Sequence, residues 1–280
     1  MRLFLLTWLT MIAFAANSVL NRMALADGAM DALDFGVIRI VSGAVTLGLL
    51  TVLLRGGVRL GGARRASGVI SLLVYIFGFS LAYRALDAGV GALILFGVVQ
   101  ITMFAGALIN GERPSVNRWV GAGVAFAGLA WLMWPGQGAQ VSIVATGFMA
   151  LAGVGWGIYS LVGRSANDGL SETAANFILA APVAILVALV IGTGSDLAMK
   201  GVLLAVLSGA VTSGLGYALW YAVLPQLEAS IAAVAQLTVP VIAMAGGLLF
   251  LAEVPDWDFV IGAVLVLGGV WLSLVKRGKT

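Results

Sequence analysis

Two stretches of the sequence decide the expected fold: GERPSVNRWVGAGVAFAGLAWL at 111–132 and AEVPDWDFVIGAVLVLGGVWL at 252–272. In each, a glutamate and a proline precede an apolar run that carries two glycines seven residues apart. Both follow the pattern E-x-P-x6-G-x6-G, formed by Glu112, Pro114, Gly121 and Gly128 and, 141 residues later, by Glu253, Pro255, Gly262 and Gly269. This match predicts that the chain consists of two related halves.

Weaker matches occur in the same order along the chain. They are Phe14 with Trp156, Ser18 with Ser160 and Arg22 with Arg164 at an offset of 142 residues, and Gly78 with Gly216, Tyr83 with Tyr221 and Leu86 with Leu224 at an offset of 138. We therefore expect a first repeat over 1–137 and a second over 138–280.

The composition indicates a membrane protein. Hydrophobic residues make up 61% of the 280 residues and charged residues 10%, whereas soluble domains have about 45–50% and about 25%. The apolar runs are long enough to cross a bilayer, which takes about 20 residues of helix. The expected spans are 3–25, 32–54, 67–85, 89–110, 118–134, 142–163, 171–192, 200–222, 228–251 and 258–275. The predicted fold class is thus an all-α membrane protein with ten transmembrane helices.

Lysine and arginine are unequally divided between the two sides that these spans define. The side with both termini carries eleven, and the other side carries three, which are Arg22, Arg84 and Lys200. Because positive residues collect on the cytoplasmic side, we expect a multi-pass protein of the cell inner membrane with both termini in the cytoplasm. The chain has no Cys and no His, so we expect no metal and no cofactor, and the net charge of +3 suggests no nucleic-acid partner.

A duplication of five helices has a geometric consequence. An odd number of spans makes the second repeat enter the membrane from the opposite side, which gives the inverted repeat common in secondary transporters. Two such halves can exchange conformations around a central cavity, so that a site near the midplane opens to each side in turn. This arrangement predicts a carrier that works by alternating access.

The 5+5 layout, the E-x-P element before the last span of each half and the Trp156-Gly157 pair of the sixth span resemble the EamA family of the drug/metabolite transporter superfamily. Within that family the composition is most similar to the YddG-type exporters of aromatic and other amino acids. The resemblance implies ten helices around a central cavity and transport without ATP hydrolysis. One departure is Pro240 in the ninth span, where the fourth span has Val99.

Polar residues inside the spans are candidates for substrate binding. Arg39 is the one basic residue within a span, and either it anchors a substrate carboxylate by paired hydrogen bonds or it snorkels to the surface or pairs with Asp34. The amides of Asn17, Gln100 and Gln236 either face a cavity or bridge helices. All acidic residues lie near span ends, which favours uniport or facilitated export over proton coupling.

Aromatic residues cluster in three spans. Such rings can line a pocket for an apolar or aromatic solute, or they can anchor the protein at the membrane interface. The candidates for the pocket are Tyr75, Phe79 and Tyr83 in the third span, Trp156 and Tyr159 in the sixth, and Tyr217 in the eighth.

Two other residue types are candidates for a role in conformational change. Pro182 and Pro240 are candidate hinges, because proline removes a backbone hydrogen bond and bends a helix. Glu112 and Glu253 are expected to cap helices at tight turns, with an ion pair that gates the transporter as the alternative.

The sequence thus predicts a transporter, not an enzyme, that exports aromatic or neutral amino acids or related metabolites. A multidrug or other metabolite carrier is the alternative, and a membrane-embedded lipid-modifying enzyme is disfavoured because the chain lacks His, Cys and clustered acids. The expected partners are a small-molecule substrate and the lipid bilayer, and we expect a monomer or weak dimer.

Overall fold

The computed structural model describes residues 1–26, 28, 30–109, 115–132, 142–163, 168–192, 197–223, 226–227 and 235–274. All regular structure in these ranges is helical, and they contain no strand. The first half forms α1 (Arg2–Leu25), α2 (Ala32–Arg55), α3 (Arg65–Ala82), α4 (Ala88–Ile109) and α5 (Val116–Leu132). The second half forms α6 (Ile143–Gly163), α7 (Gly169–Ile191), α8 (Met199–Leu207), η1 (Ser208–Leu215), α9 (Gly216–Val223), α11 (Thr238–Leu251) and α12 (Trp257–Leu274).

Polar and glycine residues set the helix ends. Asp31 precedes α2 and accepts a 2.7 Å hydrogen bond from the Leu33 amide, and Asp168 precedes α7 and accepts from the Ser171 amide. These are N-caps, which satisfy amides that have no partner within the helix. Gly56 ends α2 at a φ of 78°, a left-handed conformation that glycine adopts without a steric penalty.

Within the described ranges, seven helical segments are long and apolar enough to cross a membrane: α1, α2, α3, α4, α6, α7 and the continuous run α8–η1–α9. The apolar helices α11 and α12 are shorter by the same measure. Large hydrophobic side chains are exposed on several helices, for example Leu189, Val190 and Ile191 on α7 and Leu249 on α11. Such an apolar exterior suits lipid, so the chain is a multi-pass all-α membrane protein.

The eighth predicted span, 200–222, differs from a uniform α-helix. Its middle, η1, is a π-helix of eight residues, a form that occurs mostly in short pieces and often at functional sites. Here the backbone of Gly209 lies against α2, and a Cβ atom on Gly209 would collide with Ser42 Oγ and the Arg39 carbonyl. A side chain at this position would therefore force η1 away from α2.

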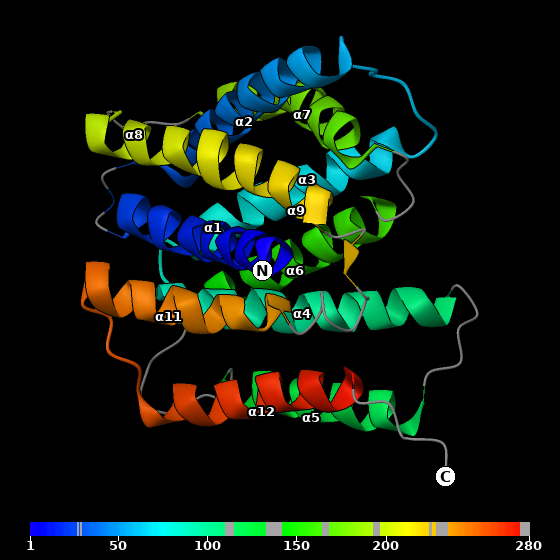
Figure 1. Ribbon diagram of the computed structural model, residues 1–280. Helices are drawn as coiled ribbons and strands as arrows, with labels where there is room; N and C mark the ends of the chain where they lie inside the picture. The colour runs from blue at the N-terminus through cyan, green and yellow to red at the C-terminus, as the bar shows by residue number, and fades with distance from the viewer. Residues whose placement is uncertain are drawn as a thin grey trace.

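The helices pack in successive layers (Figure 1). From one edge of the molecule to the other, the layers are α2 with α7, then α8–α9 with α3, then α1 with α6, then α11 with α4, and finally α12 with α5. α5 and α12 also cross closely, because a Cβ atom on Gly121 would collide with the Gly269 carbonyl and one on Gly269 would lie 2.5 Å from the Ala125 nitrogen. Glu112 and Pro114, the start of the first repeated motif, lie outside the described residues.

Candidate functional site

An aromatic cluster occupies the middle of the molecule, with Trp156 of α6 at its centre. The Trp156 ring lies 4.9 Å from that of Tyr75 on α3, 5.0 Å from that of Tyr217 on α9 and 5.9 Å from that of Phe14 on α1. These separations are those of interacting ring pairs, each worth about 0.5–1.5 kcal/mol beyond the area that they bury. Four helices from both halves of the chain therefore meet through one group of rings.

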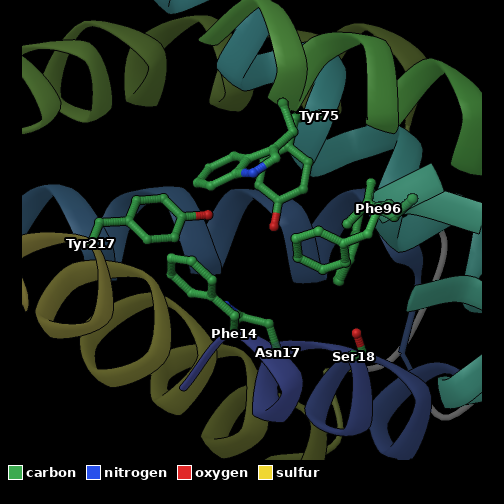
Figure 2. Close-up of a pocket in the computed structure, with 9 residues that line it drawn as sticks. Phe14, Asn17, Ser18, Tyr75, Phe96 and Tyr217 are labelled. Carbon is green, nitrogen blue, oxygen red and sulfur yellow. The ribbon is translucent and has the colours of Figure 1, made fainter. Parts of the chain in front are cut away.

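A small cavity lies beside this cluster (Figure 2). Nine residues line it: Phe14, Asn17, Ser18, Tyr75, Phe79, Leu95, Phe96, Trp156 and Tyr217. The hydroxyls of Tyr75 and Tyr217 both point into the centre of this group. The cavity volume of about 10 Å³ leaves room for about one water molecule, so in this conformation the site is closed.

Arg39 lies directly behind the cavity wall and is fully buried. Its Nη2 donates a 3.0 Å hydrogen bond to the Tyr75 hydroxyl, and its Nε donates one of 3.0 Å to Ser213 Oγ on η1. The guanidinium carbon lies 5.1 Å from the Phe79 ring centroid and 5.2 Å from that of Tyr75, within the range of cation–π contacts. Its Nη1 has no hydrogen-bond partner among the residues that the structure describes. Arg39 therefore does not snorkel to the surface.

Asn17 connects α1 to the π-helix. Its Oδ1 accepts hydrogen bonds from Ser208 Oγ at 2.8 Å, from Ser213 Oγ at 3.5 Å and from Thr212 Oγ1. Because three hydroxyls already use the oxygen, the amide NH2 is the part of Asn17 that remains for a ligand. The hydroxyl residues of η1 thus orient the side chain of Asn17 in the cavity wall.

The structure brings together half of the ten residues that the sequence suggested for substrate binding. Asn17, Tyr75, Phe79, Trp156 and Tyr217 line the cavity. Three more lie behind the lining: Arg39, Tyr83, whose ring meets that of Phe79 edge-on at 4.7 Å, and Tyr159, which stacks on Trp156 at 5.7 Å. Gln100 and Gln236 are half-buried and lie outside the cavity lining.

Sequence reasoning did not select Phe14, Ser18, Leu95 or Phe96, which also line the cavity. For two of these a signal existed, because Phe14 aligns with Trp156 and Ser18 with Ser160 in the repeat. Leu95 and Phe96 lie in the apolar part of α4 that precedes Gln100, and nothing there separates a cavity residue from a packing residue.

The two candidate hinge prolines differ in position. Pro182 lies inside α7, where a missing amide interrupts the helix. Pro240 is buried in the first turn of α11, where the amide would have no partner within the helix in any case. Residues 228–234 of the predicted ninth span lie outside the described residues; the described part of that span begins at Ala235, and α11 begins at Thr238, two residues before Pro240.

One end of the helices that form the site is held by ion pairs around Arg22 of α1. Arg22 contacts Glu253 Oε1 at 2.8 Å and Asp87 Oδ1 at 3.3 Å. The other oxygen of Glu253 accepts a 2.8 Å hydrogen bond from the Ala88 amide, the first of α4. Burial raises the pKa of Glu253 more than the hydrogen bonds from Ala88 and Arg22 lower it. Glu253 therefore both caps a helix and forms an ion pair.

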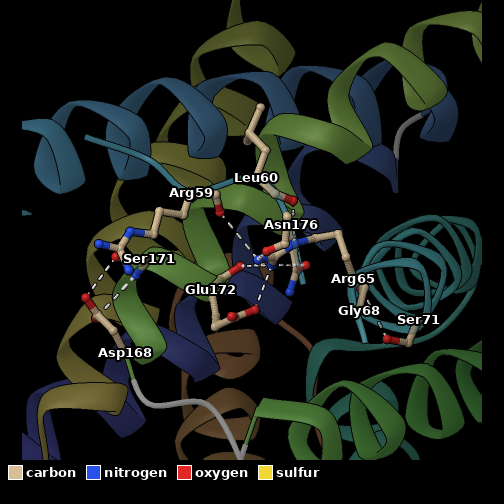
Figure 3. Close-up of polar contacts among 10 residues, drawn as sticks. Arg59, Leu60, Arg65, Gly68, Ser71, Asp168, Ser171, Glu172 and Asn176 are labelled. Atoms are coloured by element: carbon tan, nitrogen blue, oxygen red, sulfur yellow. Dashed lines mark hydrogen bonds and ion pairs between the residues drawn. The ribbon is translucent and has the colours of Figure 1, made fainter. Parts of the chain in front are cut away.

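The opposite end of these helices is held by contacts between α2, α3 and α7 (Figure 3). Arg65 contacts Glu172 Oε2 at 2.7 Å and Asn176 Oδ1 at 2.8 Å, and Arg55 contacts Asp168 at 2.8 Å. Burial favours a higher pKa for Asp168, but hydrogen bonds from Ser171 and Arg55 outweigh it and lower the pKa. Tyr75 is ten residues from Arg65, about 15 Å along α3, so the cavity lies between these two groups of ion pairs.

Comparison with known proteins agrees with this architecture. Residues 144–275 match the EamA-like transporter family. An uncharacterized protein of Pseudomonas aeruginosa, PA1977, is 43% identical over 99% of this chain and 96% of its own length. An uncharacterized transporter of Archaeoglobus fulgidus is 25% identical over 76% of this chain and 77% of its own length.

A solved crystal structure shares the fold. It has a TM-score of 0.68 and 17% sequence identity, and it covers 97% of this chain and 96% of its own chain. That structure shows the fold alone. The 43% identity over nearly the whole chain shows that the chain belongs to the same family as the Pseudomonas protein. The second half of this chain matches the EamA-like transporter family, which, with the transporter of Archaeoglobus fulgidus, indicates a transporter rather than an enzyme.

Proposed function

We propose that the protein is a secondary transporter that exports aromatic or neutral amino acids, or related small metabolites, across the inner membrane by alternating access. The observation that carries this proposal is the buried aromatic cavity. It lies midway along the helices and takes its lining from α1, α3, α4, α6 and α9. Aromatic walls with a few polar groups are typical of sites for small apolar ligands.

The packing of the helices supports two exchangeable halves. The first helix of each half packs against the third and fourth helices of the other half. Thus α6 packs against α3 and α4, and α1 packs against the run α8–η1–α9 and α11. The helices that occupy the same position in the order of each half also pack together, as α2 with α7, α4 with α11 and α5 with α12. These relations are the ones that an inverted repeat produces, and such a repeat lets a central site open to each side in turn.

The closed cavity supports a carrier that changes conformation. A volume of about 10 Å³ cannot hold an amino acid, so the rings around Trp156 must separate when substrate binds. The ion pairs at the two ends, Arg22 with Glu253 and Arg65 with Glu172, are the contacts that must break for access from either side. In alternating access they would break in turn.

Counterflow tests the proposal directly. Purified protein in liposomes loaded with unlabelled phenylalanine, threonine or methionine should take up the same labelled solute with no imposed gradient, because none of the nine lining residues is acidic. Saturable uptake above protein-free liposomes would support the proposal. Flux that requires a proton gradient would contradict the uncoupled mechanism, and no flux of any amino acid by folded protein would contradict the substrate class.

A further inference from the structure

The unsatisfied polar groups around the cavity can all donate a hydrogen bond. Within the described part of the chain, Trp156 Nε1 is buried without a hydrogen-bond partner, and it can only donate. The Tyr217 hydroxyl, which can donate or accept, is also buried without a hydrogen-bond partner among the described residues. The Tyr75 hydroxyl accepts from Arg39, which leaves its own proton for a ligand. With the NH2 of Asn17, these groups offer donors, so a ligand that satisfies them must bring acceptors.

A buried positive charge stands behind these donors. Arg39 is fully buried and reaches the cavity through the Tyr75 hydroxyl, while its Nη1 has no partner. Its hydrogen bonds go to the hydroxyls of Ser213 and Tyr75, it lies over the rings of Tyr75 and Phe79, and it interacts electrostatically with Tyr217. A buried cation that is neutralised by no carboxylate is costly, and an anionic ligand would supply the missing charge.

The same site offers little to a ligand ammonium group. None of the nine lining residues is acidic in the part of the chain that the structure describes. The strongest neutral acceptor, Asn17 Oδ1, already receives three hydroxyls. An ammonium group needs acceptors for its protons, and Arg39 would repel it.

We infer that the cavity is a receptor for apolar or aromatic monocarboxylates, in which the carboxylate is required and an α-amino group is not. The rings of Phe14, Phe96 and Trp156 bind the apolar body, and the hydroxyls of Tyr75 and Tyr217, with Arg39 behind them, bind the carboxylate. This inference rests on the proposed function, because it names the substrate class of the same site. Amino acids bind through their carboxylate, and the corresponding acids without an amino group bind at least as well.

The test is direct binding of tritiated 3-phenylpropionate to the purified full-length protein in lipid nanodiscs. Unlabelled L-phenylalanine and 2-phenylethylamine serve as competitors at neutral pH, where the carboxylates are ionised and the amines protonated. We expect saturable binding that L-phenylalanine displaces, whereas 2-phenylethylamine requires at least about a tenfold higher concentration, as expected for loss of a charged hydrogen-bonded group. Equal displacement by the amine would overturn the inference.

Two variants separate binding from folding. Tyr217→Phe removes a buried hydroxyl that has no hydrogen-bond partner among the described residues, so it should leave the thermal unfolding midpoint near the wild-type value but weaken 3-phenylpropionate binding by about fivefold or more, the effect of losing one donor to a charged group. Thr146→Val on α6 is the matched control, since its hydroxyl is also buried without a partner but lies outside the cavity lining. Wild-type affinity in Tyr217→Phe would contradict the inference.

Arg39 itself is tested by a charge-retaining and a neutral substitution. Arg39→Met should abolish the preference for the acid over the amine, and Arg39→Lys should retain it. If neither variant folds, Tyr217→Phe still decides the question.

Counterflow separates this inference from the proposed function. If labelled phenylalanine shows counterflow but 3-phenylpropionate neither binds nor competes, the inference fails and the transporter proposal stands. If 3-phenylpropionate binds as expected but no solute shows counterflow, the binding site stands and the transport proposal fails.

Discussion

At the scale of single residues, the site depends on buried polar groups that are only partly satisfied. In the described residues, two nitrogens of the Arg39 guanidinium form hydrogen bonds and the third forms none. The Tyr75 hydroxyl accepts one of these hydrogen bonds, whereas the Tyr217 hydroxyl has no hydrogen-bond partner there. This difference predicts opposite consequences for two substitutions that remove the same atom.

Tyr75→Phe removes the acceptor of Arg39 Nη2, so it leaves a second nitrogen of a buried cation unpaired. We expect a loss of about 1–3 kcal/mol in stability, seen as a lower thermal unfolding midpoint in detergent. Tyr217→Phe removes a hydroxyl without a partner and should leave the midpoint near the wild-type value. Equal midpoints for the two variants would contradict the role of the bond between Arg39 and Tyr75.

The ion pairs at the two ends predict opposite pH dependence. Burial raises the pKa of Glu253, so its carboxyl group binds a proton more tightly in the folded state than in the unfolded state. Its contribution to stability is present in acid and is lost as the pH rises through the folded pKa. Glu253→Gln, which stays neutral, should therefore match the wild-type unfolding midpoint near about pH 4 and exceed it near about pH 8.

Asp168 should behave in the opposite way. Its pKa is lowered by hydrogen bonds from Ser171 and Arg55 that outweigh burial, so its contribution is present above the unfolded pKa and is lost as the pH falls through the folded pKa. Asp168→Asn keeps a residue that can cap α7 but loses the pair with the half-exposed Arg55. We expect a lower midpoint at neutral pH, by less than about 1 kcal/mol, and a difference that shrinks in acid.

At the scale of the helices, glycines determine which helices can touch. Packing replaces the hydrophobic effect as the force that holds membrane helices together, so close backbone contact matters. Gly121 and Gly269 lie at such a contact between α5 and α12, and Gly209 lies at another between η1 and α2.

Gly121→Leu should therefore separate α5 from α12. Its Cβ would lie 2.5 Å from the Ser273 nitrogen and 2.8 Å from the Ser273 Cα, and overpacking of this kind costs about 1–3 kcal/mol or more. Gly123→Leu, two residues along the same helix, is the control, because nothing lies within 4 Å of its Cβ position. Size-exclusion chromatography in detergent should show aggregation of Gly121→Leu alone; equal behaviour of the two variants would argue against this crossing.

At the scale of the whole molecule, the unequal distribution of Lys and Arg predicts the orientation in the membrane. The loop between α2 and α3 belongs to the basic side, and the turn between α3 and α4 belongs to the other. Gly61 and Ala85 are exposed at these two places, and the wild-type chain has no Cys. Single cysteines can therefore report the topology without a background signal.

Gly61→Cys should react with a membrane-impermeant maleimide only from the cytoplasmic side, in inverted vesicles, and Ala85→Cys only from the periplasmic side, in intact spheroplasts. The physical reason is that loops rich in Lys and Arg stay in the cytoplasm. The opposite labelling pattern would reverse the predicted orientation and, with it, the direction that export implies.

The sequence by itself determined where the helices lie, because in a bilayer each helix satisfies its own backbone hydrogen bonds and needs only a sufficiently apolar segment of adequate length. The helices from α1 to α7 begin and end within a few residues of the predicted spans. It also indicated the Gly121 and Gly269 motif and five residues of the cavity lining, because the repeat and the aromatic clusters are visible along the chain.

Only the tertiary structure decided which polar groups meet. Arg39 bonds Tyr75, 36 residues away, and Ser213, 174 residues away, and no local pattern marks such partners. The π-helical form of η1, the saturation of the Asn17 oxygen and the position of Gln100 outside the cavity likewise follow from contacts between helices. Hydrogen-bond satisfaction in the interior is a property of the packed helices and not of any one segment, which is why the sequence indicated the rings but not the free donors between them.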